Sequence, residues 1–259
     1  MSYVEPLSGF LVGTMVGLTG VGGGSLMAPI MILLLGIAPA TAVGTDLWFA
    51  AITKMVGGAV HQHHGNPDWR VVKLLATGSI PASVLMLIFL WGAESHQIKG
   101  GLIVHFLGIL LILTAIATLM RKQVHKHART MRTETAKTFK LWQPGLTVFA
   151  GAILGLLVTL TSVGAGALGA TMLILLYPLR MNARKVVGTD IIHAVPLTIV
   201  AGVGHFFIGN VDFNLLLPLL VGSIPGIIIG ARLTKHVQGN YLRLALAFML
   251  LFTGIRLMF

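Results

Sequence analysis

The sequence predicts an all-α polytopic membrane protein built from two inverted repeats, each a re-entrant or broken-helix hairpin followed by three transmembrane helices. Hydrophobic residues make up 56% of the chain and charged residues 10%, with a mean hydropathy of +0.91, whereas a soluble domain has about 25% charged residues. The second observation is that motifs of the first half recur in the second. The third is that basic residues gather in one loop, which is typical of the cytoplasmic side of membrane proteins.

Two four-residue motifs occur once in each half. They are Val-Gly-Thr-Asp, at residues 43–46 and 187–190, and Gly-Ser-Ile-Pro, at residues 78–81 and 222–225. The glycine-rich residues 18–28 also match residues 160–170. A tandem repeat of this length indicates two copies of one structural unit. The expected units are a first membrane repeat at residues 1–120, a basic cytoplasmic linker at 121–140 and a second, inverted membrane repeat at 141–259.

Each half opens with two apolar segments that are too short to cross a bilayer. They are residues 7–19 and 25–36 in the first half, and residues 145–161 and 167–177 in the second. A helix of a dozen residues is roughly 18 Å long, against a hydrocarbon core of about 30 Å. We therefore expect each pair to form a hairpin whose tip lies deep in the protein, where surrounding groups satisfy the non-helical backbone.

Three further segments in each half are long enough to span the bilayer. They are residues 40–62, 69–91 and 101–120, then residues 185–208, 213–231 and 241–259. One hairpin and three spans give an odd number of crossings per half. The second repeat is therefore expected to be inverted relative to the first.

The loop at residues 121–140 sets the predicted orientation. Its basic residues are opposed only by Glu134, and they are Arg121, Lys122, Lys126, Arg129, Arg132, Lys137 and Lys140. Such a loop lies in the cytoplasm of a multi-pass cell-membrane protein. This orientation places the N-terminus and the C-terminus outside, where Lys99 is the one basic residue of the predicted loops.

The same distribution of charge argues against nucleic acid as a partner. The chain has 18 Lys and Arg against 7 Asp and Glu, but the excess is concentrated in one loop between spans rather than on a binding face. The absence of cysteine excludes disulfides, iron–sulfur clusters and thiol catalysis. The lipid bilayer and a small solute are the expected partners, with no cofactor.

The two hairpin tips are the predicted binding site. Proteins with inverted repeats and interrupted helices bind solutes near the membrane midplane, and the second arm of each hairpin begins at its tip. Its free N–H groups and positive dipole end favour an anion. The candidate binding residues of the first tip are Gly20, Gly22, Gly23, Gly24 and Ser25, and those of the second are Ser162, Gly164, Ala165, Gly166 and Ala167.

Other glycines have a simpler interpretation. Several recur at four-residue spacing, which makes a flat helix face for close packing. They are Gly9, Gly13 and Gly17, then Gly151 and Gly155.

Ionisable residues inside the spans are functional candidates by default. Asp46, Lys54, Asp190 and His193 are interpreted as coupling or gating residues, together with the neighbouring Thr45 and Thr189. Lys54 can meet an anion or pair with Asp46, and Asp190 can hold His193 one turn away. The alternative for the aspartates and threonines is a helix-start role at the interface. A proton is the candidate coupling ion.

Three histidines and two further aspartates are interpreted differently. His61, His63 and His64 form either a transition-metal site or a solvated interface, and no carboxylate-rich motif accompanies them. We predict no resident metal. Asp68 and Asp212 are interpreted as turn formers.

The paired glycine tips and the repeated Val-Gly-Thr-Asp and Gly-Ser-Ile-Pro motifs resemble the sulfite exporter TauE/SafE family of membrane transporters, over almost the whole chain. The resemblance implies secondary active transport of a small sulfur-containing anion, such as sulfite, sulfoacetate or another organosulfonate, across the cytoplasmic membrane. Rival hypotheses are an anion channel and a transition-metal transporter that uses the three histidines. An enzyme is not expected, because no His-Glu-x-x-His or Gly-x-Ser-x-Gly motif is present.

Overall fold

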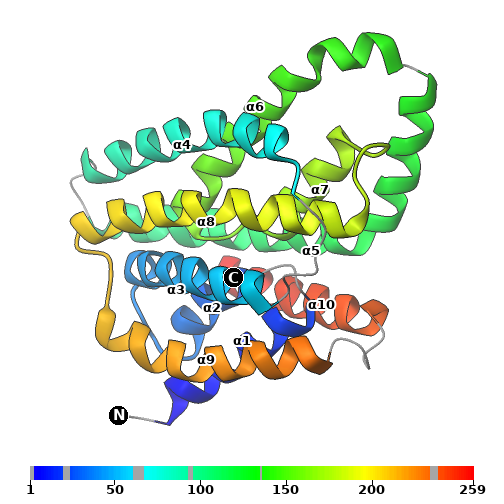
Figure 1. The fold of residues 1–259 in the computed structure, drawn as a ribbon. Helices are drawn as coiled ribbons and strands as arrows, with labels where there is room; N and C mark the ends of the chain where they lie inside the picture. The colour runs from blue at the N-terminus through cyan, green and yellow to red at the C-terminus, as the bar shows by residue number, and fades with distance from the viewer. Residues whose placement is uncertain (1–2, 20–23, 61–66, 93–95, 135, 234–238) are drawn as a thin grey trace.

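The described part of the chain is α-helical throughout (Figure 1). The computed structural model describes residues 3–19, 24–60, 67–92, 96–134, 136–233 and 239–259. Its helices are α1 (Val4–Thr19), α2 (Gly24–Leu33), α3 (Pro39–Val60), α4 (Trp69–Gly92), α5 (His96–Glu134), α6 (Ala136–Thr161), α7 (Ala167–Leu176), α8 (Ala183–Phe207), α9 (Phe213–Leu233) and α10 (Gly239–Met258).

Five of these helices contain a stretch long and apolar enough to cross a membrane. The stretches are Trp69–Gly92, Ile103–Arg121, Phe139–Thr161, Lys185–Phe207 and Phe213–Leu233. Shorter apolar helices lie at Val4–Leu18, Ala167–Leu176 and Leu244–Met258. The predicted class, an all-α multi-pass membrane protein, is confirmed.

The basic segment at residues 121–140 differs from the expected loop. Helix α5 is 39 residues long and continues to Glu134, and α6 starts at Ala136. Figure 1 shows these ends of α5 and α6 projecting beyond the other helices. The segment has no glycine or proline and contains four Lys and three Arg, which are good helix formers. The basic composition did not predict this helical conformation, and the cytoplasmic side of the segment stays a prediction.

The second hairpin also differs from its predicted shape. Its first arm was expected at residues 145–161, whereas α6 starts at Ala136 and has a stretch at Phe139–Thr161 that is long enough to cross. Pro144 lies inside this helix without ending it. Its second arm, α7, has 10 residues and remains short. One long helix and one short helix therefore meet at the second tip.

The spaced glycines lie in close helix contacts, as their spacing predicted, and these contacts join helices of opposite halves. Helix α1 packs along α9, and α6 packs along α4. A Cβ at Gly13 would overlap the backbone of Ser223, and a Cβ at Gly155 would overlap the backbone of Ser79. These two contacts are equivalent under the sequence repeat. Each half thus supplies a helix that packs tightly on the other half.

Helices α3 and α8 also pack together, and each bonds the connection that follows the other. Thr45 Oγ1 accepts the Asp212 N–H at 3.1 Å, and Thr189 Oγ1 accepts the Asp68 N–H at 3.0 Å. Gly44, near the start of α3, lies against Asn210, which follows the end of α8. The two equivalent helices therefore run antiparallel where they pack. Two halves related by a two-fold axis would make paired contacts of this kind.

Candidate functional site

The helix break between α6 and α7 forms the second tip. Ser162, Gly164 and Gly166 have φ values of 59°, 121° and 131°, in the region that glycine adopts most readily and a serine only with strain. The turn is closed by the Gly169 N–H, which donates to the Gly164 carbonyl at 3.0 Å. Residues 162–166 are buried. The tip is thus a defined backbone structure inside the protein.

Helix α7 begins at this tip without a side-chain cap. Gly166 occupies the N-cap position, and no side-chain hydrogen bond caps the helix there. The first N–H groups of an α-helix have no partner within the helix and carry its positive dipole end. The second tip therefore presents the kind of anion-attracting helix start that the sequence analysis predicted.

Lys54 reaches this tip from α3 in the other half of the chain. It is buried, and its Nζ donates a hydrogen bond to the Ala165 carbonyl at 3.0 Å. The ammonium is in electrostatic range of both Asp46 and Asp190. It forms no ion pair with Asp46, whose carboxylate oxygens have no hydrogen-bond partner in the part of the chain that the structure describes. Lys54 therefore lies at the tip predicted to bind an anion, and the alternative, an ion pair with Asp46, is not formed.

The side chain of Asp190, which belongs to α8, lies at the start of α7. Its buried carboxylate faces the backbone N–H of Gly166, and a Cβ at Gly169 would overlap its Oδ1 atom. A negative group is stabilised at this helix end. In this structure, the chain's own carboxylate takes the position that the sequence analysis assigned to a bound anion.

Asp46 lies between the two hairpins. Its carboxylate faces the side chain of Ser162 at the second tip and the backbone of Ala28 in α2. Asp46 is fully buried and Ser162 is 3% exposed. Among the described residues, no hydrogen-bond partner exists for either carboxylate oxygen of Asp46 or for the Ser162 hydroxyl.

His193 has a different partner from the predicted one. Its Nε2 atom lies 2.8 Å from Ser79 Oγ in α4, and its Nδ1 atom has no hydrogen-bond partner in the described structure. The prediction that Asp190 holds this ring is therefore wrong. His193 points to the other half of the chain, where the repeated Gly-Ser-Ile-Pro motif places a serine.

The first tip is only partly described. Gly20, Gly22 and Gly23 lie outside the described residues, and Gly24 and Ser25 begin α2. Their role in binding stays a prediction. His61, His63 and His64 also lie outside the described residues.

Comparison with known proteins gives the family. The model of the family described as sulfite exporter TauE/SafE matches residues 6–257. The chain belongs to this family. It is a membrane transporter, and the family is one of transporters rather than enzymes.

Similar proteins named probable membrane transporters match the chain over nearly their full lengths. The chain is 39% identical to the probable membrane transporter protein YjnA of Bacillus subtilis, over 99% of the chain and 100% of that protein. It is 28% identical to YdhB of the same organism, over 96% and 97%. It is 26% identical to MJ0441 of Methanocaldococcus jannaschii, over 95% and 91%. Both are named probable membrane transporter proteins. No solved structure matches the chain.

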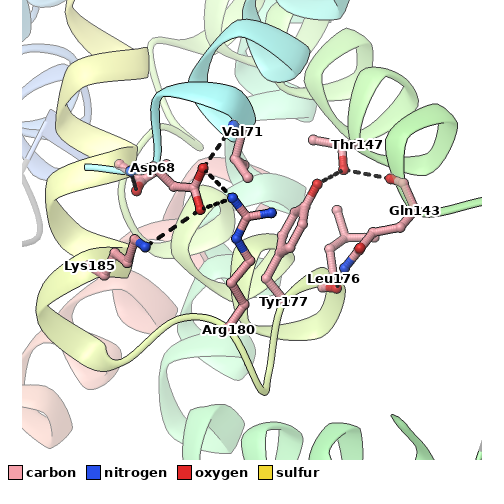
Figure 2. A network of polar contacts seen from close by, with 9 residues as sticks. Asp68, Val71, Gln143, Thr147, Leu176, Tyr177, Arg180 and Lys185 are labelled. Carbon is pink, nitrogen blue, oxygen red and sulfur yellow. Dashed lines mark hydrogen bonds and ion pairs between the residues drawn. The ribbon is translucent and has the colours of Figure 1, made fainter. Parts of the chain in front are cut away.

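An ion-pair network in this TauE/SafE transporter was not predicted (Figure 2). Arg180 Nη2, in the connection between α7 and α8, lies 2.7 and 2.9 Å from the two carboxylate oxygens of Asp68, and Lys185 Nζ lies 3.7 Å from Asp68 Oδ2. Asp68 also accepts the Val71 N–H at the start of α4. Its predicted role at a turn is only part of its function, because it ties the first half of the chain to the second.

The equivalent aspartate of the second half has no such network. Asp212 Oδ1 accepts the N–H groups of Asn214 and Leu215 at 2.9 and 3.2 Å, at the start of α9. Within the described chain, it forms no ion pair like that of Asp68. The two equivalent aspartates of this TauE/SafE protein therefore differ in their partners: Asp68 pairs with basic side chains, and Asp212 bonds backbone N–H groups.

Proposed function

We propose that this chain is a secondary active transporter that moves a small sulfur-containing anion across the cytoplasmic membrane by alternating access. Sulfite, sulfoacetate and other organosulfonates are the candidate substrates. The proposal rests on membership of a transporter family described as sulfite exporters and on one structural observation. A buried helix start whose N-cap residue is a glycine and a lysine from the opposite half meet at the second hairpin tip.

The chemistry of this tip suits an oxyanion. Backbone N–H groups at a helix start bind sulfate- and carboxylate-like groups through hydrogen bonds and the helix dipole. Lys54 supplies a full positive charge at the Ala165 carbonyl. The first tip is expected to contribute in the same way, through Gly24 and Ser25 at the start of α2. Two backbone sites and one ammonium would then surround one small anion.

Asp190 must leave its position before an anion can bind there. Its carboxylate faces the Gly166 N–H, and two negative groups at one helix end repel each other. We therefore assign a coupling role to Asp190, which can be displaced from α7 when the substrate arrives. Asp46 is a second buried carboxylate beside the tip, and His193 is in electrostatic range of Lys54. A proton is the proposed coupling ion.

Transport in proteoliposomes tests this function. Purified protein should take up ³⁵S-labelled sulfite or sulfoacetate with saturation, and an excess of unlabelled anion on the opposite side should accelerate exchange. Flux that rises linearly with concentration and shows no exchange would identify a channel. The absence of flux for every sulfur anion would reject the substrate class.

A variant at the tip locates the site. Gly164→Ala forces a side chain onto a φ of 121° and should reduce anion affinity by about tenfold or more, because the backbone N–H groups move. Gly36→Ala is the matched control, since Gly36 has a φ of 65° with nothing within 4 Å of its Cβ position. Equal effects of the two variants would show that backbone strain, and not the tip, causes the loss.

A further inference from the structure

Three buried oxygen atoms around the second tip have no hydrogen-bond partner within the described part of the chain. They are both carboxylate oxygens of Asp46 and the hydroxyl oxygen of Ser162. Asp46 is 0% exposed and Ser162 is 3% exposed, so bulk water does not reach them. Buried polar atoms are nearly always paired, and an isolated buried carboxylate is costly. A ligand that supplies positive charge would satisfy this group.

The helix that ends at Ser162 favours positive charge at this point. Ser162 directly follows the last residue of α6, and the C-terminal end of a helix carries a partial negative charge and unpaired carbonyl groups. Only a few residues later, α7 starts with the opposite polarity. The tip therefore has a cation-attracting side at Ser162 and an anion-attracting side at Gly166.

Among the described residues, no cation forms an ion pair with Asp46. Lys54, on the same helix, is the charged group that faces it, but the Lys54 ammonium bonds the Ala165 carbonyl and forms no ion pair with Asp46. The other neighbours of the Asp46 carboxylate are the neutral Ser162 side chain and the Ala28 backbone. The negative charge of Asp46 is thus available to a ligand.

We propose that Asp46 and Ser162 form the binding site of a small monovalent cation, a proton or Na⁺, that is coupled to transport. One carboxylate and one hydroxyl suit a single positive charge, whereas Ca²⁺ takes 6–8 oxygen ligands. Asp46 comes from the first half and Ser162 from the second, so the bound cation would hold the two halves together. Unwound backbone and half-helix ends hold coupling ions in other transporters with broken helices.

The inference rests on the proposed function only for the coupling itself. In the loaded state, the cation at Ser162 and the anion near Gly166 lie at opposite ends of the same short turn. Each lowers the electrostatic cost of burying the other. This proximity explains why an anion would be transported together with a cation and not alone.

Thermal unfolding of the purified full-length protein in detergent, without any anionic substrate, tests the cation site. One arm titrates NaCl against choline chloride at fixed pH, and the other varies pH in choline chloride. A ligand that binds only the folded state raises the midpoint temperature with its concentration. One of the two cations should raise the midpoint temperature of the wild type.

Two variants and two controls assign that effect. Asp46→Asn should abolish the response, and Ser162→Ala should raise the cation concentration for half-maximal effect by about tenfold, because one of the ligands is lost. Ser223→Ala is the control for the serine, since Ser223 is also buried with an unpartnered hydroxyl. Asp212→Asn is the control for the carboxylate. Both controls should respond like the wild type.

The outcomes separate the cation site from the transport proposal. A response to Na⁺ that Asp46→Asn removes identifies Na⁺, and a response to pH that it removes identifies a proton. A response that Asp46→Asn and Ser162→Ala leave unchanged overturns the site. If Asp46→Asn does not fold, Ser162→Ala decides alone. Sulfite transport with an unchanged cation response in the variants would reject only this inference, and a cation response without sulfur-anion transport would reject only the substrate.

Discussion

Replacing Arg180 with glutamine should destabilise the protein more than replacing Asp68 with asparagine, although both changes break the same ion pair. The Asp68 side chain is 4% exposed and the Arg180 side chain is 46% exposed. Arg180→Gln leaves a buried carboxylate with only Lys185 at 3.7 Å. Asp68→Asn leaves a guanidinium that water can solvate, and the asparagine oxygen can still accept the Val71 N–H.

The magnitudes follow from this difference in burial. Hydrogen bonds to charged groups contribute about 1.5–3 kcal/mol, and an unpaired buried charge adds to the loss. We expect Arg180→Gln to lower the free energy of unfolding by about 2 kcal/mol, because Lys185 offsets part of the charge. Asp68→Asn should cost about 1 kcal/mol, since the remaining cation is half exposed.

Thermal unfolding in mild detergent measures both variants and their combination. A loss of 1 kcal/mol corresponds to about 2–4 °C in midpoint temperature for a chain near this size. The double variant should be more stable than Arg180→Gln alone, because it has no unpaired buried carboxylate. Equal losses for the two single variants, or additive losses in the double variant, would refute this account of Asp68.

Three further predictions concern the tip and the packing of the halves. Lys54→Gln should reduce sulfite affinity by about tenfold or more in equilibrium binding, because the ammonium that bonds the Ala165 carbonyl is removed. Asp190→Asn should tighten sulfite binding by several-fold in the same assay, since the competing charge leaves α7; weaker binding would contradict the displacement model. Gly155→Leu should destabilise the protein by about 3 kcal/mol or more, because its Cβ overlaps the Ser79 backbone. Gly145→Leu, on the same helix with nothing within 4 Å, should change stability little.

Local patterns predicted most helices and their packing. The spans expected at residues 69–91 and 213–231 correspond to α4 (Trp69–Gly92) and α9 (Phe213–Leu233), since long apolar runs have clear ends. Gly155 was assigned to packing from its spacing, and it does contact another helix closely. Both predictions depend on residues near one another in the sequence, where periodicity and composition are informative.

Contacts between distant residues were not predictable in the same way. The ion pair of Asp68 and Arg180 joins residues 112 positions apart, and the bond of His193 to Ser79 joins residues 114 positions apart. Neither pair has a local signature, because each side chain is also compatible with an exposed loop or a nearer partner. The tip glycines were predictable as a helix break, but Asp190 at the start of α7 required the packing of α8 against α7.

The repeat could produce two equal binding sites, but the residues around the tips differ in a way that favours one. Asp46 and Asp190 are equivalent under the repeat, whereas Lys54 corresponds to Thr198. The Thr198 hydroxyl donates to the Ala194 carbonyl of its own helix at 2.9 Å and offers no positive charge. In the described part of the chain, these two carboxylates therefore share one buried ammonium, that of Lys54. An anion needs that ammonium, so we expect one sulfite bound per chain in isothermal titration calorimetry, and two equal sites per chain would show that the backbone N–H groups alone suffice.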